Sequence, residues 1–129
     1  MIKLEQKKFV ERRFKAMDLA LYCDDASKSR ELQEMLAQMN FYQISLFDTA
    51  YDFTKFVSGR SDIIMVLILS GAPGTETAMS AKEQAPNGKL IWFSDMDFSL
   101  LSYRIHADYF GMLPVDNEKI KNILQNVAS

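Results

Sequence analysis

The feature that most constrains the fold is a repeated alternation of short apolar runs with segments of helical periodicity. Residues 63–69 form an unbroken apolar run of strand length, and residues 18–23 and 89–93 are mainly apolar runs of similar length. Continuous apolar runs of this length are typical of strands buried on both faces of a parallel sheet. Between them, apolar residues such as Leu32 and Leu36 recur at helical spacing. Strands that alternate with helices favour parallel pairing through right-handed crossovers.

The sequence therefore predicts an α/β three-layer sandwich with a five-stranded parallel sheet of order 2-1-3-4-5. The expected strands are 18–23, 41–47, 63–69, 89–93 and 108–112, and the expected helices are 26–39, 49–57, 75–84, 97–105 and 116–127. A further helix is expected over residues 3–15, where Ile2, Phe9, Val10 and Phe14 make a partial apolar stripe. We therefore expect an N-terminal helical extension at 1–16 and one α/β domain at 17–129.

Composition limits the classes of protein to which this chain can belong. Its 129 residues are 48% hydrophobic, which is enough for one domain with a substantial core. No apolar run approaches the roughly 20 residues that a membrane-spanning helix needs, and no apolar segment follows the first charges as in a secretory signal. The single cysteine, Cys23, excludes an internal disulfide and suits a reducing compartment. We expect a cytoplasmic protein without a membrane partner.

Charge is distributed unevenly along the chain. Residues 1–15 carry six basic and two acidic side chains, whereas the remainder carries nine basic and fifteen acidic ones. A basic arm is able to contact nucleic acid or an anionic lipid surface. The arm has no dense basic run and the rest of the chain is acidic, so a solvated charged helix is the favoured interpretation.

Four stretches, in this order and spacing, resemble a known family. They are Leu-Tyr-Cys-Asp-Asp at 21–25, Asp62 followed by Pro73-Gly74, Lys-Leu-Ile-Trp-Phe-Ser at 89–94, and Ala-Asp-Tyr-Phe-Gly-Met-Leu-Pro-Val-Asp at 107–116. Together they are similar to the receiver domain of bacterial two-component response regulators, in particular the class that precedes LytTR-type DNA-binding domains. The resemblance covers residues 17–128.

The resemblance implies roles for individual residues. Asp24 and Asp25 fall where the family places its magnesium-binding acidic pair. Ser94 falls at the hydroxyl that senses the phosphoryl group, and Phe110 at the rotameric aromatic of the last strand.

Two reactive positions of the family are replaced in this chain. The phosphoacceptor aspartate maps to Leu67 when counted from Asp62, or to Leu69 when counted back from Pro73-Gly74. The lysine that precedes the last proline is replaced by Leu113. The resemblance is therefore to a degenerate receiver, in which Leu67 or Leu69 is expected to contact Leu113 and fill the former pocket as an apolar plug.

The altered residues argue against catalysis. Two adjacent carboxylates, without a third from the next strand, would hold Mg²⁺ weakly at best, so no metal or other cofactor is expected. Ser70 would need an activating base to act as a nucleophile, and the single histidine, His106, lies far along the sequence. We expect that the protein is not an enzyme.

These residues favour a pseudo-receiver that takes part in signal transduction or transcription regulation through protein contacts, without aspartate phosphorylation. Its expected contact surface, and the site of an expected homodimer, is lined by Phe98, Leu101, Tyr103 and Tyr109. One alternative is a flavodoxin-like regulatory domain that binds a small ligand at the carboxyl ends of the strands, and another is a receiver phosphorylated at a different residue. DNA contact is expected only through a further domain outside this chain.

Overall fold

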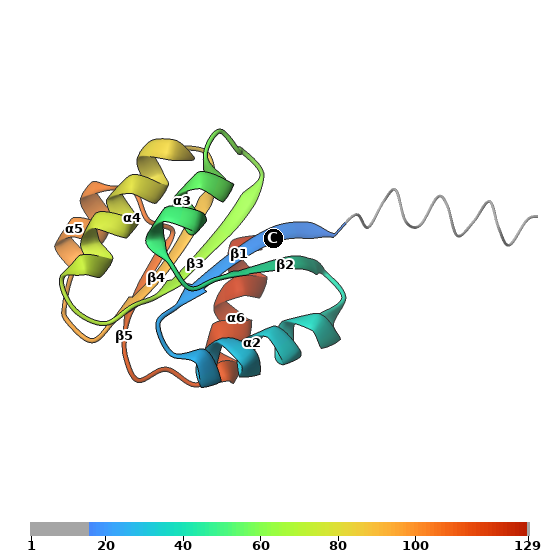
Figure 1. Cartoon of the computed structure of the whole chain (residues 1–129). Coiled ribbons are helices and arrows are strands. Elements are labelled where there is room, and N and C mark those ends of the chain that lie inside the picture. Colours follow the sequence, from blue (N-terminus) through green and yellow to red (C-terminus); the bar gives the residue numbers. More distant parts are fainter. Residues whose placement is uncertain (1–15, 129) are drawn as a thin grey trace, which may run out of the picture.

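The computed structural model describes residues 16–128, which form a single parallel sheet between two layers of helices (Figure 1). The strand order is β2-β1-β3-β4-β5, and every neighbouring pair is parallel. The strands are β1 (Met17–Cys23), β2 (Tyr42–Phe47), β3 (Ile63–Ile68), β4 (Lys89–Ser94) and β5 (Tyr109–Met112). The predicted fold class and strand order are confirmed.

Five helices connect and follow the strands in the described part of the chain. They are α2 (Ala26–Met39), α3 (Ala50–Val57), α4 (Pro73–Gln84), α5 (Ser99–Arg104) and α6 (Asn117–Ala128). Helices α2 and α6 cover one face of the sheet, and α3, α4 and α5 cover the other (Figure 1). The helix predicted over residues 3–15 lies outside the described residues. In the described part of the chain, no helix is both long and apolar enough to cross a membrane.

The sheet separates two hydrophobic clusters. The α2/α6 cluster includes Leu19, Leu21, Leu32, Leu36, Ile68, Phe93, Ile120 and Leu124. The α3/α4 cluster includes Phe53, Leu67, Leu69, Ala78, Ala81, Leu90 and Trp92. All six residues of β3 are buried, because successive side chains of this central strand point into one cluster and then the other.

Local signals set the ends of the helices. Thr49 caps α3 by accepting a hydrogen bond from the amide of Asp52, and Pro73 occupies the first turn of α4. Asp97 accepts a hydrogen bond from the amide of Ser99, so α5 begins two residues later than predicted. The helix after β3 begins at Pro73 rather than at residue 75, because proline is well tolerated in a first turn.

Candidate functional site

The residues singled out by the family resemblance gather at one edge of the sheet. Asp24 and Asp25 follow β1, Ser94 ends β4, and Leu113 follows β5. Because all the strands are parallel, their carboxyl ends lie at the same edge, where doubly wound folds place their ligand sites. The structure therefore places these positions at one edge of the sheet, where the loop between β3 and α4 also lies.

Asp25 is used as a helix cap. Its Oδ1 accepts hydrogen bonds from the amides of Ser27 at 3.0 Å and Lys28 at 3.3 Å, and its backbone is extended. These two amides belong to the first turn of α2, whose free amide groups favour an acidic partner. The Asp25 carboxylate is therefore committed to the start of α2, which limits its use as a magnesium ligand.

Asp24 is bonded to the loop that follows β3. The amide of Ser70 donates to Asp24 Oδ2 at 2.7 Å, while the amide of Asp24 donates to the carbonyl of Ile68 at 3.1 Å. A carboxylate that accepts a main-chain amide forms one of the stronger kinds of hydrogen bond in proteins. Asp24, at the end of β1, therefore holds the loop through which the chain leaves β3.

Asp95 holds the same loop from the side of β4. The amide of Gly71 donates to Asp95 Oδ1 at 2.8 Å, and Gly71 has a φ of +80°, which glycine adopts without a steric penalty. Asp24 and Asp95 thus bind consecutive amides, and we call these four residues, Asp24, Ser70, Gly71 and Asp95, the carboxylate clamp. Sequence reasoning missed Asp95, although an acidic residue directly after Ser94 at the end of a strand was an available signal.

The two candidate acceptor positions are both buried. Leu67 is fully buried and Leu69 is 4% exposed, and both side chains belong to the α3/α4 cluster. A Cβ atom added at Gly74 would lie 3.1 Å from the Cβ of Leu69, so the start of α4 packs closely over this leucine. Neither leucine side chain offers an oxygen atom where the family places its acceptor carboxylate, although Leu69 and Asp24 both line a hollow of about 300 Å³ at this edge.

Leu113 lies on the other side of the sheet. It is half-buried and packs against the α2/α6 cluster, whereas Leu67 and Leu69 belong to the α3/α4 cluster. The predicted apolar plug is therefore wrong, because Leu113 has the same parity as Tyr109 and faces α2 and α6 as Tyr109 does.

A lysine from another element binds the loop that Leu113 begins. Lys28 Nζ in α2 donates to the carbonyl of Val115 at 2.9 Å and to Asn117 Oδ1 at 2.6 Å. Its charge thus holds the start of α6, which sequence reasoning did not anticipate.

Ser94 and Phe110 are also occupied by internal contacts. Ser94 is fully buried, its Oγ accepts from the amide of Met96 at 3.2 Å, and its carbonyl accepts from the amide of Leu113 at 2.8 Å. The ring of Phe110 meets Trp92 edge-on with centroids 5.0 Å apart, while Phe98 stacks on Trp92 at 5.6 Å. Phe110 therefore points inward and packs against an aromatic pair.

The chemistry of the remaining polar groups near this edge is limited. Among residues 16–128, no group of three His, Cys, Asp or Glu side chains is arranged to hold a metal ion. Burial raises the pKa of the Cys23 thiol, and the nearby charges of Asp24 and Asp25 raise that pKa further, against the opposing effect of its hydrogen bond to the Asp25 carbonyl. The thiol is therefore protonated at neutral pH and a poor nucleophile.

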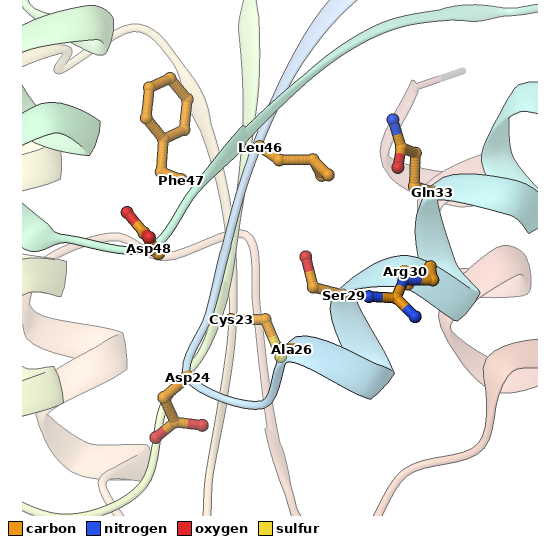
Figure 2. Close-up of a pocket in the computed structure, with 9 residues that line it drawn as sticks. All are labelled: Cys23, Asp24, Ala26, Ser29, Arg30, Gln33, Leu46, Phe47 and Asp48. Atoms are coloured by element: carbon orange, nitrogen blue, oxygen red, sulfur yellow. The ribbon is translucent and has the colours of Figure 1, made fainter.

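A hollow of about 520 Å³ lies beside the acidic pair, between α2 and the end of β2. Figure 2 shows Ser29, Arg30 and Gln33 along α2, with Leu46 reaching toward them from β2. The carboxylate of Asp24 turns away from Leu46 in this view, as its bond to Ser70 requires. The other lining residues are Cys23, Ala26, Phe47 and Asp48.

Comparison with known proteins identifies the fold. No protein-family model matches the sequence, and no curated protein sequence matches it. Among solved structures, a CheY-like response regulator receiver domain protein from Methanospirillum hungatei superposes with a TM-score of 0.74 at 18% identity, over 86% of this chain and 92% of that one.

Two further structures illustrate the range of proteins with this fold. A CheY-like response regulator protein from Mesorhizobium loti gives a TM-score of 0.63 at 22% identity, over 87% of this chain and 98% of that one. A structure described as adenylate cyclase from Rhodopirellula baltica gives 0.72 at 16% identity, over 88% and 87% of the two chains. The chain therefore has the receiver-type, flavodoxin-like fold.

Proposed function

We propose that this protein is a receiver-like signalling domain that works through protein contacts and is not switched by aspartate phosphorylation. The proposal rests on the residues at the edge of the sheet where receiver domains are phosphorylated. Both candidate acceptor positions are buried leucines, and both carboxylates of the acidic pair accept main-chain hydrogen bonds. Signal transduction, including transcription regulation, is the role that the receiver-type fold of its structural neighbours suggests.

The arrangement of the reactive groups also favours a non-enzymatic role. Ser70 lies in the loop after β3, whereas His106 lies in the turn before β5, at the opposite ends of the strands. The single histidine therefore cannot activate Ser70 directly. The name adenylate cyclase belongs to one structural neighbour at 16% identity and supports no enzymatic proposal for this chain.

We predict that incubation with Mg²⁺ and acetyl phosphate or phosphoramidate leaves the protein unmodified. The reason is that no carboxylate stands at Leu67 or Leu69 to receive the phosphoryl group. Intact-protein mass spectrometry checks this, with a conventional receiver domain as the positive control. A stable gain of one phosphoryl group, mapped to Asp24, Ser70 or any neighbouring residue, would favour the alternative of a receiver phosphorylated elsewhere.

The contact surface is centred on α5. Phe98 and Leu101 are half-buried against the α3/α4 cluster, and Tyr109 is half-buried against the α2/α6 cluster, so they contribute less than the sequence suggested. Tyr103 is 80% exposed, and Leu100 on the same helix is 63% exposed. With exposed Met96 in the preceding loop, they form an apolar α5 patch suited to a protein partner.

A photo-crosslinking amino acid at Leu100 is expected to capture a discrete protein in cells that express the chain naturally. The same group at Gln38, an exposed position on α2, serves as the matched control. Equal capture from both positions, or none from Leu100, would contradict the assignment of the contact surface to α5.

A small-ligand regulatory domain is the second candidate, and the hollow in Figure 2 is the observation that favours it. It is hollowed at the carboxyl ends of β1 and β2 and carries both polar and apolar lining groups. NMR shift changes confined to Ser29, Arg30 and Gln33 on addition of a metabolite mixture would support this candidate. Changes at Tyr103 on addition of a protein partner support the first one.

A further inference from the structure

The strand at the edge of the sheet lacks the features that usually prevent pairing. In the described part of the chain, β2 pairs only with β1, so the main-chain groups on its outer side have no strand partner (Figure 1). From Phe41 to Phe47 there is no charged residue and no proline. Soluble proteins commonly protect long edge strands with lysine, proline, bulges or a covering segment. As far as residues 16–128 are concerned, the outer edge of β2 is therefore open to strand addition.

An exposed aromatic side chain lies at one end of β2 and a hollow at the other. At its amino end, Phe41 is 59% exposed, although its carbonyl accepts a hydrogen bond from the amide of Met17 and so fixes its backbone to β1. Beside its carboxyl half, a hollow of about 590 Å³ opens between β2 and α3. We call this the β2–α3 groove, and it is lined by Leu46, Phe47, Asp48, Asp52, Lys55, Phe56 and Arg60.

The β2–α3 groove contains an aromatic pair and cationic side chains. Phe47 and Phe56 lie with ring centroids 5.0 Å apart, and the Arg60 guanidinium stands 4.0 Å from the centroid of Phe56. Aromatic side chains gain from offset or edge contacts with other rings and from nearby cations. Lys55 supplies a second cation along the same wall.

We propose that two copies of this chain pair their β2 strands antiparallel across a two-fold axis, forming one continuous sheet. In this arrangement, the amino end of each strand lies beside the carboxyl end of the other. Phe41 of each copy then enters the β2–α3 groove of its partner. Pairing supplies main-chain hydrogen bonds, and the groove supplies side-chain specificity, as in other cases of strand addition.

The alternation of side chains supports this arrangement. Phe47 packs on the α3 side of the sheet. Phe41 directly precedes β2 and its carbonyl bonds to Met17 of β1, so extending the alternation of β2 by one residue gives Phe41 the parity of Phe47. A two-fold axis perpendicular to the sheet leaves each face on its own side, so Phe41 reaches the side on which the groove opens. The strand carries no charge, so pairing places no like charges opposite one another within it.

A second copy fits this edge better than an unrelated peptide does. Phe41 directly precedes β2, and the groove proposed to accept it begins at the carboxyl end of the same strand, at Leu46 and Phe47. Each copy therefore supplies what the other requires, as an isologous contact demands. This contact does not use the α5 patch, so it can be tested separately from the proposed function.

The test is light scattering on the full chain at tens of micromolar, with three variants. Phe41→Ser removes the aromatic, and Gln43→Lys places a charge at an exposed position of the edge strand. Tyr103→Ser is the matched control, because it removes an exposed aromatic from α5. We expect a dimer for the wild type and for Tyr103→Ser, and a dissociation constant raised at least about tenfold in both β2 variants.

Hydrogen exchange distinguishes this contact from other ways of covering β2. The outer amides of Tyr42–Phe47 are expected to exchange faster on dilution, because dilution separates the two copies. Protection that is independent of concentration would show that residues 1–15 or another segment of the same chain cover the edge, and would overturn the proposal. A monomeric wild type, or a dimer that persists in Gln43→Lys, would also overturn it.

Discussion

Replacing Leu67 by aspartate is expected to lower the free energy of unfolding by about 4 kcal/mol or more, because it places an unpaired carboxylate in an apolar cluster. Leu67 is fully buried on β3 and surrounded by the α3/α4 cluster. Leu69→Asp is expected to cost less, about 2–3 kcal/mol, since Leu69 lies just past the end of β3, one residue before exposed Ser70. Urea denaturation monitored by the fluorescence of the single tryptophan, Trp92, measures both changes.

Leu67→Asn and Leu69→Asn are the matched controls, because they keep the size of aspartate without its charge. The difference between each pair isolates the cost of the buried charge. If Leu69→Asp is as stable as the wild type, the exit of β3 still accommodates a carboxylate. This variant should then be tested for phosphorylation, because a carboxylate would again stand at the acceptor position while Leu113 still replaces the lysine.

The fold could be predicted from the sequence because its strongest signals are periodic. The unbroken apolar run at residues 63–69 identified the central strand, and the helical spacing of Leu32 and Leu36 identified α2. The phosphoacceptor position could be aligned with either Leu67 or Leu69, and both alignments place it on the same face of the sheet. Residues two apart on a strand face the same way, and both leucines lie in the α3/α4 cluster.

The candidate site was predicted less well, because it depends on loops. The expected contact of Leu113 rests on matching residue positions to the family, whereas the alternation of β5 places Leu113 on the side of Tyr109, opposite Leu67 and Leu69. The two bonds from Lys28, to Val115 before α6 and to Asn117 at its first residue, join positions 87 and 89 residues apart in the sequence. The structure places Asp24 and Asp25 after β1, as the sequence predicted, and their role as a magnesium-binding pair stays a prediction. Their hydrogen-bond partners could not be read from residue types.

The carboxylate clamp gives the second large expected effect. Replacing both Asp24 and Asp95 by alanine removes two charge-assisted hydrogen bonds to the loop after β3, at 2.7 and 2.8 Å. Hydrogen bonds to charged groups contribute about 1.5–3 kcal/mol each. Both of these bonds are exposed, so we take the lower value for each and expect a total loss of about 3 kcal/mol. The amides of Ser70 and Gly71 are expected to exchange about tenfold to a hundredfold faster, as measured by NMR.

The asparagine variants Asp24→Asn and Asp95→Asn separate hydrogen bonding from charge, because an amide oxygen can still accept from Ser70 or Gly71. Both should retain most of the amide protection, whereas the two single alanine variants should each expose one amide. Asp24 and Asp95 bind consecutive residues of one loop, so their effects on the free energy of unfolding should be coupled. The loss in the double alanine variant should therefore differ from the sum of the losses in the two single variants. Strict additivity with unchanged exchange would show that the loop is held by its packing, through Leu69 and Gly74, and that the carboxylates remain available to a ligand.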